Sequence, residues 1–506
     1  MKNFFKLQSF VIAIILAIGL SFGACVEGDD DNDIDNDIDN DSDNDSDSNA
    51  KVTGVSISPD TVVVIKGKFH TFTAKVTGDK NVAQTVVWSI SESGKEEGTS
   101  IDDTGKLTVA DNESLKLITV KAVSTEDAEK SATASVSIIP DFTLEQPIND
   151  ITATELVAGM KIGWNLGNTF DAGYPTWFTN PTVIQIETSW LGGTQYATKK
   201  SNFDTLKTAG FNAVRIPVSW NKVVDEEYNI RADWMARVTE VVNYAVANDM
   251  YILLNTHHDE DIFKFSNADV AASLIAFNKI WGQIADNFKN YDEKLVFEAL
   301  NEPRIKGGQN EWNGGTPEAR NNLNTHYQNF IQTVRESGGN NGKRILMVNT
   351  FGASAGDNAV NGLVIPTDTV ENKIIVSVHA YTPYNFALNT NLNYSSWSSS
   401  NSSDKSEITN NLDRVKTKFI DNGYPVIMGE FGAMTKNNEE ARAAWAQFYV
   451  SEAMNRGIPC FWWDNHAFVT SNTEPKSEGF GFLKRDTNEF AFPNLLEALM
   501  EGAGVR

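Results

Sequence analysis

Two glutamates in this sequence each follow a run of apolar residues of the kind that a folded chain buries. Glu302 comes shortly after the run 295–300, and Glu430 comes directly after the run 425–429. A carboxyl pair can cleave a glycosidic bond, because one group protonates the departing oxygen while the other attacks or stabilises the anomeric carbon. These two carboxylates are therefore the first candidates for a catalytic pair.

Polar and aromatic residues also end the other apolar runs. They are Asn165, Asn168, Arg215, His257, His258, Asn301, Asn349, His379, Tyr381, Trp463 and Asp464. A guanidinium such as that of Arg215 keeps a neighbouring carboxylate ionised. We expect His379 and Tyr381 to donate hydrogen bonds to Glu430. We expect Asn301 to bind the hydroxyl next to the reacting carbon. A domain used only as a scaffold has no need of this concentration of polar groups.

A third glutamate, Glu298, lies four residues before Glu302 and shares its strand parity. At about 3.3 Å per residue it would lie roughly 13 Å deeper along the strand. A carboxylate in that place is expected to form a buried structural ion pair rather than to react.

Tryptophans are frequent near the ends of the apolar runs and in the segments that follow them. They are Trp177, Trp190, Trp220, Trp312, Trp462 and Trp463. Sugars present flat C–H faces that stack on indole rings, so exposed tryptophans suit a polysaccharide cleft. Core packing is the alternative for each of them.

Eight apolar runs alternate with amphipathic stretches between residues 151 and 506. The runs are 160–164, 213–217, 251–254, 295–300, 345–348, 374–378, 425–429 and 459–463, and the helical stretches include 232–247, 271–288, 319–336 and 439–455. Buried strands alternating with helices predict an α/β fold, a (β/α)8 TIM barrel with its site at the carboxyl ends of the strands. The alternative is a doubly wound open sheet, but no glycine-rich phosphate loop follows the first run.

The first 50 residues have the composition of an export signal and a spacer. Two lysines precede the apolar run 10–20, which is followed by small residues and Cys25. This pattern predicts a signal peptide over 1–24 and resembles a bacterial lipoprotein signal, in which Cys25 carries the lipid. Ordinary signal-peptide cleavage nearby is the alternative. The Asp/Asn/Ser tract 25–50 is expected to be a disordered linker, and it lacks the glycine and glutamate spacing of a calcium loop.

The charge and the cysteines exclude two other classes of protein. The 506 residues carry a net charge of −25, which would repel the phosphates of a nucleic acid. The two cysteines, Cys25 and Cys460, do not form a disulfide framework. Cys460 lies in an apolar run and is expected to be a buried thiol.

Residues 51–140 have a different texture, with short β-branched runs and turns at regular spacing. The runs are 55–58, 61–65, 70–76, 86–90, 106–109 and 134–139. Their alternation predicts a small all-β sandwich. It resembles the bacterial Ig-like domain group 2 in the opening 55–59, the Trp88–Ser89 strand and the turn 103–109. We expect a spacer, with weak carbohydrate contact as the alternative, and a connector over 141–150.

Six motifs in chain order resemble glycoside hydrolase family 5, most closely its subfamily 4 of broad-specificity endoglucanases and xyloglucanases. They are GWNLGNT (163–169), FNAVRIPVSW (211–220), NTHH (255–258), NEPR (301–304), HAYTPY (379–384) and MGEFG (428–432). The resemblance covers 151–505, and it implies a retaining double displacement on a (β/α)8 barrel.

The resemblance also implies roles for single residues. It makes Glu302 the acid/base and Glu430 the nucleophile. The supporting residues that it implies are Arg215, His257, Asn301, His379, Tyr381 and Trp463. His257 is preferred to its neighbour His258, and Trp463 to its neighbour Trp462. Further candidates for substrate contacts are Asn168, His258, Trp177 and Trp312.

The sequence therefore predicts a secreted endo-β-1,4-glucanase acting on a cellulose-type glucan, a mixed-linkage glucan or xyloglucan. Xylan and mannan are the alternative backbones. We expect a monomer, with no cofactor or metal, held at the outer-membrane surface through a lipid on Cys25.

Two rival functions follow from other features. A metal-dependent hydrolase is suggested by His257-His258-Asp259-Glu260, but adjacent histidines on one strand point to opposite faces. A non-catalytic carbohydrate-binding lipoprotein is disfavoured by the presence of both Glu302 and Glu430.

Overall fold

The computed structural model describes residues 51–79, 81–175, 177–468 and 479–506. The predicted signal peptide, the predicted lipidation site Cys25 and the predicted linker 25–50 lie outside the described residues. No helix within the described ranges is long and apolar enough to cross a membrane.

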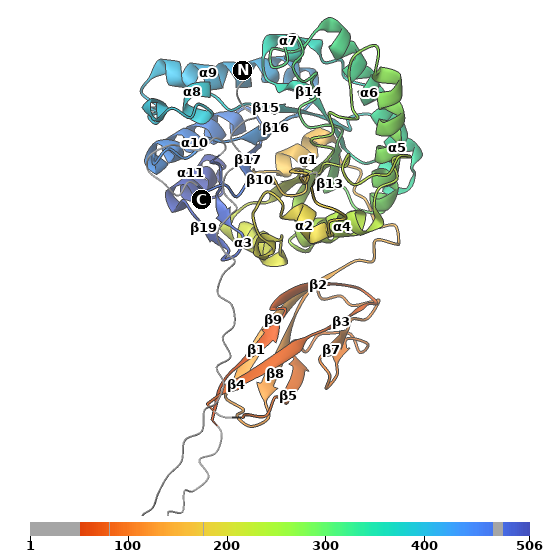
Figure 1. The fold of residues 1–506 in the computed structure, drawn as a ribbon, viewed down its shortest axis with the longest axis vertical. Helices are drawn as coiled ribbons and strands as arrows, with labels where there is room; N and C mark the ends of the chain where they lie inside the picture. Colours follow the sequence, from red (N-terminus) through yellow and green to blue (C-terminus); the bar gives the residue numbers. More distant parts are fainter. Residues whose placement is uncertain (1–50, 80, 176, 469–478) are drawn as a thin grey trace, which may run out of the picture. The chain divides into compact units, whose positions relative to one another are not determined.

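The N-terminal module is built from β-strands alone (Figure 1). Its strands are β1 (Val52–Ser58), β2 (Thr61–Ile65), β3 (Phe69–Thr71), β4 (Thr73–Gly78), β5 (Val86–Ile90), β6 (Ser100–Ile101), β7 (Lys106–Thr108), β8 (Leu117–Ser124) and β9 (Ser131–Ile139). They form a sheet β2-β9-β8-β5, a sheet β3-β7-β6 and a pair β1-β4. The sequence did not predict β8, whose alternate residues Ile118, Val120 and Ala122 are fully buried. The Ig-like resemblance itself stays a prediction.

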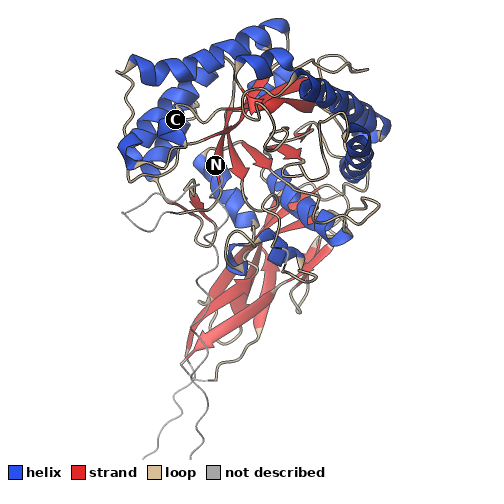
Figure 2. Cartoon of the chain, turned by 45° about the horizontal axis from the view of Figure 1, so that its top comes forward, coloured by secondary structure: helices blue, strands red, loops and turns tan. Residues whose placement is uncertain are grey.

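Eight parallel strands close into a barrel in chain order, which confirms the predicted fold and excludes the open sheet. The strands are β10 (Ile162–Leu166), β11 (Ala213–Ile216), β12 (Tyr251–Asn255), β13 (Leu295–Glu298), β14 (Leu346–Ser354), β15 (Ile374–His379), β16 (Val426–Phe431) and β17 (Cys460–Asp464). Each contains or overlaps one of the predicted apolar runs. Figure 2 shows these strands surrounded by helices.

Four helices match the predicted amphipathic stretches 232–247, 271–288, 319–336 and 439–455 to within two residues at each end, and the sequence predicted no bounds for the others. The helices are α1 (Ala153–Gly159), α2 (Val183–Glu187), α3 (Lys200–Ala209), α4 (Ala232–Ala247), α5 (Val270–Phe288), α6 (Pro317–Glu336), α7 (Asp357–Gly362), α8 (Tyr384–Ala387), α9 (Ser402–Lys418), α10 (Glu439–Met454) and α11 (Pro493–Gly502). Short 3-10 turns lie at Thr194–Tyr196, Gly339–Gly342, Leu392–Tyr394 and Ile420–Asn422, and a small hairpin joins β18 (Leu483–Lys484) to β19 (Glu489–Phe490).

The interior of the barrel changes from apolar to polar along the strands. One cluster of buried apolar side chains draws on seven strands and on α1, and its strand members are Ala213, Leu253, Val296, Met347, Ile375, Ile427 and Phe461. Because strand side chains repeat every second residue on one face, the next inward positions lie two residues further on. Five of these are the buried polar residues Arg215, Asn255, Glu298, Asn349 and Ser377, and buried Asn165 of β10 lies beside Arg215 in the strand register. The apolar layer therefore supports a polar one at the carboxyl ends of the strands.

Strand β16 contains an irregularity that decides which way Glu430 faces. Val378 of β15 pairs with Met428, and His379 pairs with Glu430, so Gly429 has no partner in this register. A bulge of this kind shifts the residues after it to the other face of the strand. Strict alternation from the inward Ile427 would turn Glu430 outward, and the extra residue turns it into the barrel.

Candidate active site

The two catalytic candidates converge at the carboxyl end of the barrel. Glu430 lies in β16 and is 5% exposed, and Glu302 lies four residues beyond the end of β13. One carboxylate oxygen of each residue and a ring nitrogen of His379 all lie within 4.8 Å of one another. Carboxyl groups about 5 Å apart suit a retaining mechanism, whereas an inverting enzyme needs a wider gap to admit water.

Arg215 is the centre of the buried polar layer. Its Nη1 donates to Glu430 Oε1 at 2.8 Å, and its Nε donates to Glu298 Oε2 at 2.6 Å. The second hydrogen of Nη1 reaches Asn165 Oδ1 at 3.1 Å, and Nη2 donates to Asn301 Oδ1 at 2.8 Å. Burial alone would lower the pKa of Arg215, but the charges and hydrogen bonds of the two glutamates outweigh it and raise the pKa. The guanidinium is therefore a permanent cation beside Glu430.

Glu298 is in a buried ion pair, as its parity suggested, but it is not remote from the site. Asn255 Nδ2 and Asn349 Nδ2 donate to its two oxygens at 3.1 Å and 2.8 Å. Only the guanidinium of Arg215 separates it from Glu430. The sequence predicted that Glu298 forms a buried ion pair. It did not predict that the partner is Arg215, which also binds Glu430.

Tyr381 and His379 form hydrogen bonds to different catalytic glutamates. The Tyr381 hydroxyl donates to Glu430 Oε2 at 2.8 Å, as expected. The expectation that His379 also hydrogen-bonds Glu430 is wrong: His379 Nδ1 lies 3.1 Å from Glu302 Oε1 and 3.7 Å from Glu430 Oε2. Both oxygens of Glu430 already accept from other donors, Oε1 from Arg215 and Oε2 from Tyr381. Burial and the negative charges of both glutamates raise the pKa of Tyr381, so its hydroxyl stays a donor.

His257 packs between Trp463 and a buried carboxylate. Its ring lies parallel to the Trp463 indole with centroids 5.9 Å apart, and its Nε2 is 3.8 Å from Asp171 Oδ2. Burial lowers the pKa of His257 well below its usual value, so the ring is neutral. Asp171, two residues after Thr169 in the first motif, was missed by the sequence reasoning.

The argument that His257 and His258 face opposite sides of a strand is wrong. Strand β12 ends at Asn255, so both histidines lie in the following loop, where alternation does not apply. One nitrogen of each and an oxygen of Asp171 lie within 4.8 Å of one another. His258 pairs instead with Glu260, at 3.6 Å from Nδ1 to Oε1.

Charged groups other than His379 also act on the carboxylate of Glu302. Arg304 Nη1 is 3.8 Å from its Oε2, and His258 is close enough to act on it electrostatically. Burial raises the pKa of Glu302, but the hydrogen bond and charge of His379 and the charges of Arg304 and His258 lower it overall. The pKa of His258 is itself raised, because Glu260 and Asp171 outweigh the opposing effect of burial.

The tryptophans separate into core and surface groups. Trp220 and Trp462 are fully buried, so their expected place in a substrate cleft is wrong: both rings face outward from the barrel into the helical layer. Trp177 is 77% exposed, Trp312 is 54% exposed, and Trp190 is also exposed. Trp463, 8% exposed, faces His257. Asn168 is half-buried in the loop after β10, and its backbone N–H donates to Asp171.

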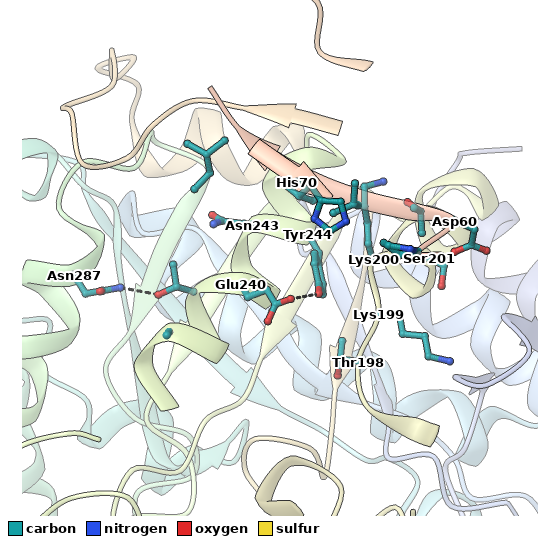
Figure 3. A pocket seen from close by; sticks show the side chains of 17 residues that line it. Asp60, His70, Thr198, Lys199, Lys200, Ser201, Glu240, Asn243, Tyr244 and Asn287 are labelled. Atoms are coloured by element: carbon teal, nitrogen blue, oxygen red, sulfur yellow. Dashed lines mark hydrogen bonds between the residues drawn. The ribbon is translucent and has the colours of Figure 1, made fainter. Parts of the chain in front are cut away.

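A cavity of about 700 Å³ lies away from these residues (Figure 3). Residues of β2, α3 and α4 contribute to its lining, among them Lys200 and Tyr244, together with Asp60, which precedes β2. None of the predicted site residues lines it. The expectation that Cys460 is a buried thiol is confirmed, since Cys460 is a free, fully buried cysteine.

Comparison with known proteins assigns this barrel to a family. The family model for cellulase (glycosyl hydrolase family 5) matches residues 171–469. The chain belongs to glycosyl hydrolase family 5. The predicted family and fold are thereby confirmed, and family 5 enzymes are retaining glycosidases.

Relatives of this family-5 chain are endoglucanases. Endoglucanase A of Clostridium longisporum is 40% identical over 352 residues, which are 69% of this chain and 66% of that protein, just under two thirds. Endoglucanase 1 of Ruminococcus albus is 41% identical over 378 residues, 74% of this chain and 87% of that protein.

A solved structure of a GH5-4 broad specificity endoglucanase from Ruminococcus champanellensis, with bound cellotriose, is 46% identical. It superposes with a TM-score of 0.66 over 70% of this chain and 100% of that one. The family-5 domain of this chain is therefore an endo-β-glucanase domain.

Proposed function

We propose that the chain hydrolyses internal β-1,4-glucosidic bonds of a plant cell-wall glucan, with Glu430 as nucleophile and Glu302 as acid/base. The observation that carries this proposal is the approach of the two carboxylates to within 4.8 Å, with Arg215 hydrogen-bonded to Glu430. Arg215 and Tyr381 each donate to one oxygen of Glu430, so this carboxylate is held in a fixed orientation for attack.

The reaction follows in two displacements. Glu430 attacks the anomeric carbon and forms a glycosyl ester, while Glu302 transfers its proton to the departing glycosidic oxygen. Glu302, now a carboxylate, takes a proton from a water molecule that attacks the same carbon. The ester bond to Glu430 breaks, and the sugar leaves with its configuration retained. Arg215 also fixes the Asn301 amide through its oxygen, which orients the NH2 group away from the guanidinium.

Replacement of each acid tests the assignment. Glu430→Ala should lose detectable turnover while keeping fold and glycan affinity, and added azide should restore part of the activity with an α-glycosyl azide as product. Glu302→Ala should lose about 10²- to 10⁴-fold on polysaccharide and far less on aryl glycosides whose leaving group needs no proton. An azide adduct of retained configuration from Glu430→Ala would contradict the role given to Glu430.

The substrate that we propose is a cellulose-type glucan, a mixed-linkage glucan or xyloglucan. The exposed rings of Trp177 and Trp312 support a polysaccharide, since indoles stack on sugar faces. Hydrolysis of a panel of soluble polysaccharides with product analysis distinguishes these glucans from xylan and mannan. Full activity after dialysis against a chelator is expected, and metal-reversible loss would favour the metal-dependent alternative.

We also propose that the protein is a monomer anchored by a lipid on Cys25 at the outer-membrane surface. The support is the sequence of the first 25 residues, with lysines, an apolar run and small residues before the cysteine. Incorporation of a labelled fatty acid that Cys25→Ala abolishes is the corresponding measurement.

A further inference from the structure

Arg304, two residues after Glu302, is held by three carboxylates at the edge of the site. Its Nη1 donates to the backbone oxygen of Glu302 at 3.0 Å and lies 3.8 Å from the carboxylate. Its Nη2 lies 3.1 Å from Glu260 Oε1, and its Nε lies 3.2 Å from Glu311 Oε1. The side chain is 9% exposed, so solvent screens these contacts less than those of a surface pair.

The flat face of the same guanidinium meets Trp312. The central carbon of Arg304 lies 4.5 Å from the centroid of the indole, which is a cation–π distance. Trp312 is nevertheless 54% exposed. Arg304 therefore packs against one face of the indole, and a large part of the ring remains free to stack on a sugar.

We propose that Arg304 is a positioning residue of the reaction, which holds the carboxyl of Glu302 and braces Trp312 as a sugar platform. This proposal rests on the proposed role of Glu302 as acid/base. The two glutamates Glu260 and Glu311 take two edges of the guanidinium, and a planar fork held on two edges cannot turn freely. One side chain thus fixes both the group that gives the proton and a ring that receives a sugar.

The electrostatic consequence has a definite sign. Glu302 is faced by His379 from β15, by Tyr381 after it, by Glu430 from β16, by His258 from the loop after β12 and by Arg304. Arg304 and His379 are the cationic or donor groups in contact with the carboxylate of Glu302.

Loss of the charge of Arg304 should raise the pKa of Glu302. Loss of the anion Glu311, which partly neutralises Arg304, should lower that pKa. Because Glu302 must be protonated to act, kcat/KM falls as pH rises through its pKa in the free enzyme.

The test compares pH profiles of kcat/KM on a soluble β-glucan for the full chain and four variants. Arg304→Gln should move the alkaline limb up by about one pH unit, and Glu311→Gln should move it to lower pH. Arg304→Lys keeps the charge and loses the planar face, so its limb should stay near that of the wild type while KM rises several-fold. Lys306→Gln is the matched control, because this lysine of the same loop is 57% exposed and pairs with Glu260.

Two results would overturn the inference. The first is an alkaline limb that neither Arg304→Gln nor Glu311→Gln moves, and the second is a limb that Lys306→Gln moves as far as Arg304→Gln does. Glu311→Gln keeps the cation in place, so it gives an answer even where Arg304→Gln folds poorly, as thermal unfolding would show. If Glu302→Ala retains the wild-type alkaline limb on an aryl glycoside, the proposed function fails instead.

Discussion

At the scale of single residues, the site is organised around one guanidinium with two anionic partners. Arg215 contacts Glu298 and Glu430 through separate nitrogens, and Asn165 and Asn301 accept from Nη1 and Nη2. Each of the three guanidinium nitrogens therefore has a fixed acceptor, which orients the group without help from the substrate. The second oxygen of Glu430 is held from the other side by Tyr381.

Removal of that second donor should weaken catalysis without disturbing the fold. A hydrogen bond to a charged group contributes about 1.5–3 kcal/mol, so Tyr381→Phe should lower kcat/KM by roughly 10- to 100-fold. Tyr244→Phe is the matched control, since Tyr244 donates to Glu240 on α4 at 2.6 Å, outside the site. Equal losses in the two variants would show that the Tyr381 hydroxyl acts through stability alone.

The sequence predicted which residues meet in the site better than it predicted their partners. Polar residues at the ends of apolar runs identified Arg215, Tyr381 and Glu430, because the carboxyl ends of barrel strands face one space. The partner of His379 depends on a sub-ångström choice between two carboxylates, which spacing does not encode. Arg304 was visible in the NEPR motif, but its contact with Trp312 depends on the path of a loop.

At the scale of elements, the bulge in β16 makes the catalytic pair possible. Gly429 lies inside the barrel, where an added Cβ would come within 2.6 Å of Ser377 Oγ and 3.0 Å of His379 Nε2. Any larger residue would push on the strand that carries His379. The apolar periodicity predicted the strand itself, but it could not predict the bulge, because an extra residue leaves no mark in an apolar run.

Gly429→Ala should therefore lower activity more than stability. The added methyl group must displace the His379 ring or the bulge, and an over-packed core costs typically about 1–3 kcal/mol. We expect a loss in kcat/KM of at least about 10²-fold, since small misplacements of catalytic groups have effects of that size. The control is Gly282→Ala in α5, whose new Cβ would meet one atom at 3.9 Å and should be neutral or slightly stabilising. A Gly429→Ala enzyme with wild-type kcat/KM would contradict the role of the bulge.

At the scale of the whole molecule, the catalytic groups all come from the barrel. The residues of the site lie between Asn165 and Trp463, and the all-β module ends with β9 at Ile139. The hydrophobic core of that module, with Phe72, Leu107 and Val136, is separate from the cluster inside the barrel. The order of the two regions was predictable because residues 51–140 show only the period-two pattern of strands. Residues from 151 onward alternate apolar runs with helical patterns. The strand β8 was missed, since its buried residues are interrupted by lysine and threonine.

Deletion of residues 26–140 should accordingly leave activity on a soluble β-glucan within about twofold of the full chain. The measurement is kcat/KM for both forms, with thermal unfolding to confirm that the shortened chain is folded. A large loss in a folded protein would mean that the all-β module shapes the substrate cleft.

The ion pair between Glu298 and Arg215 has a consequence for the time course of each turnover. When Glu430 becomes a sugar ester, it is no longer an anion, and Arg215 loses one of its two counterions. Glu298 takes no part in bond making and keeps its contact with Arg215. The Arg215 guanidinium is therefore still held in its original orientation when water releases the sugar. The hydrogen-bond donor for the returning Glu430 carboxylate does not have to be repositioned.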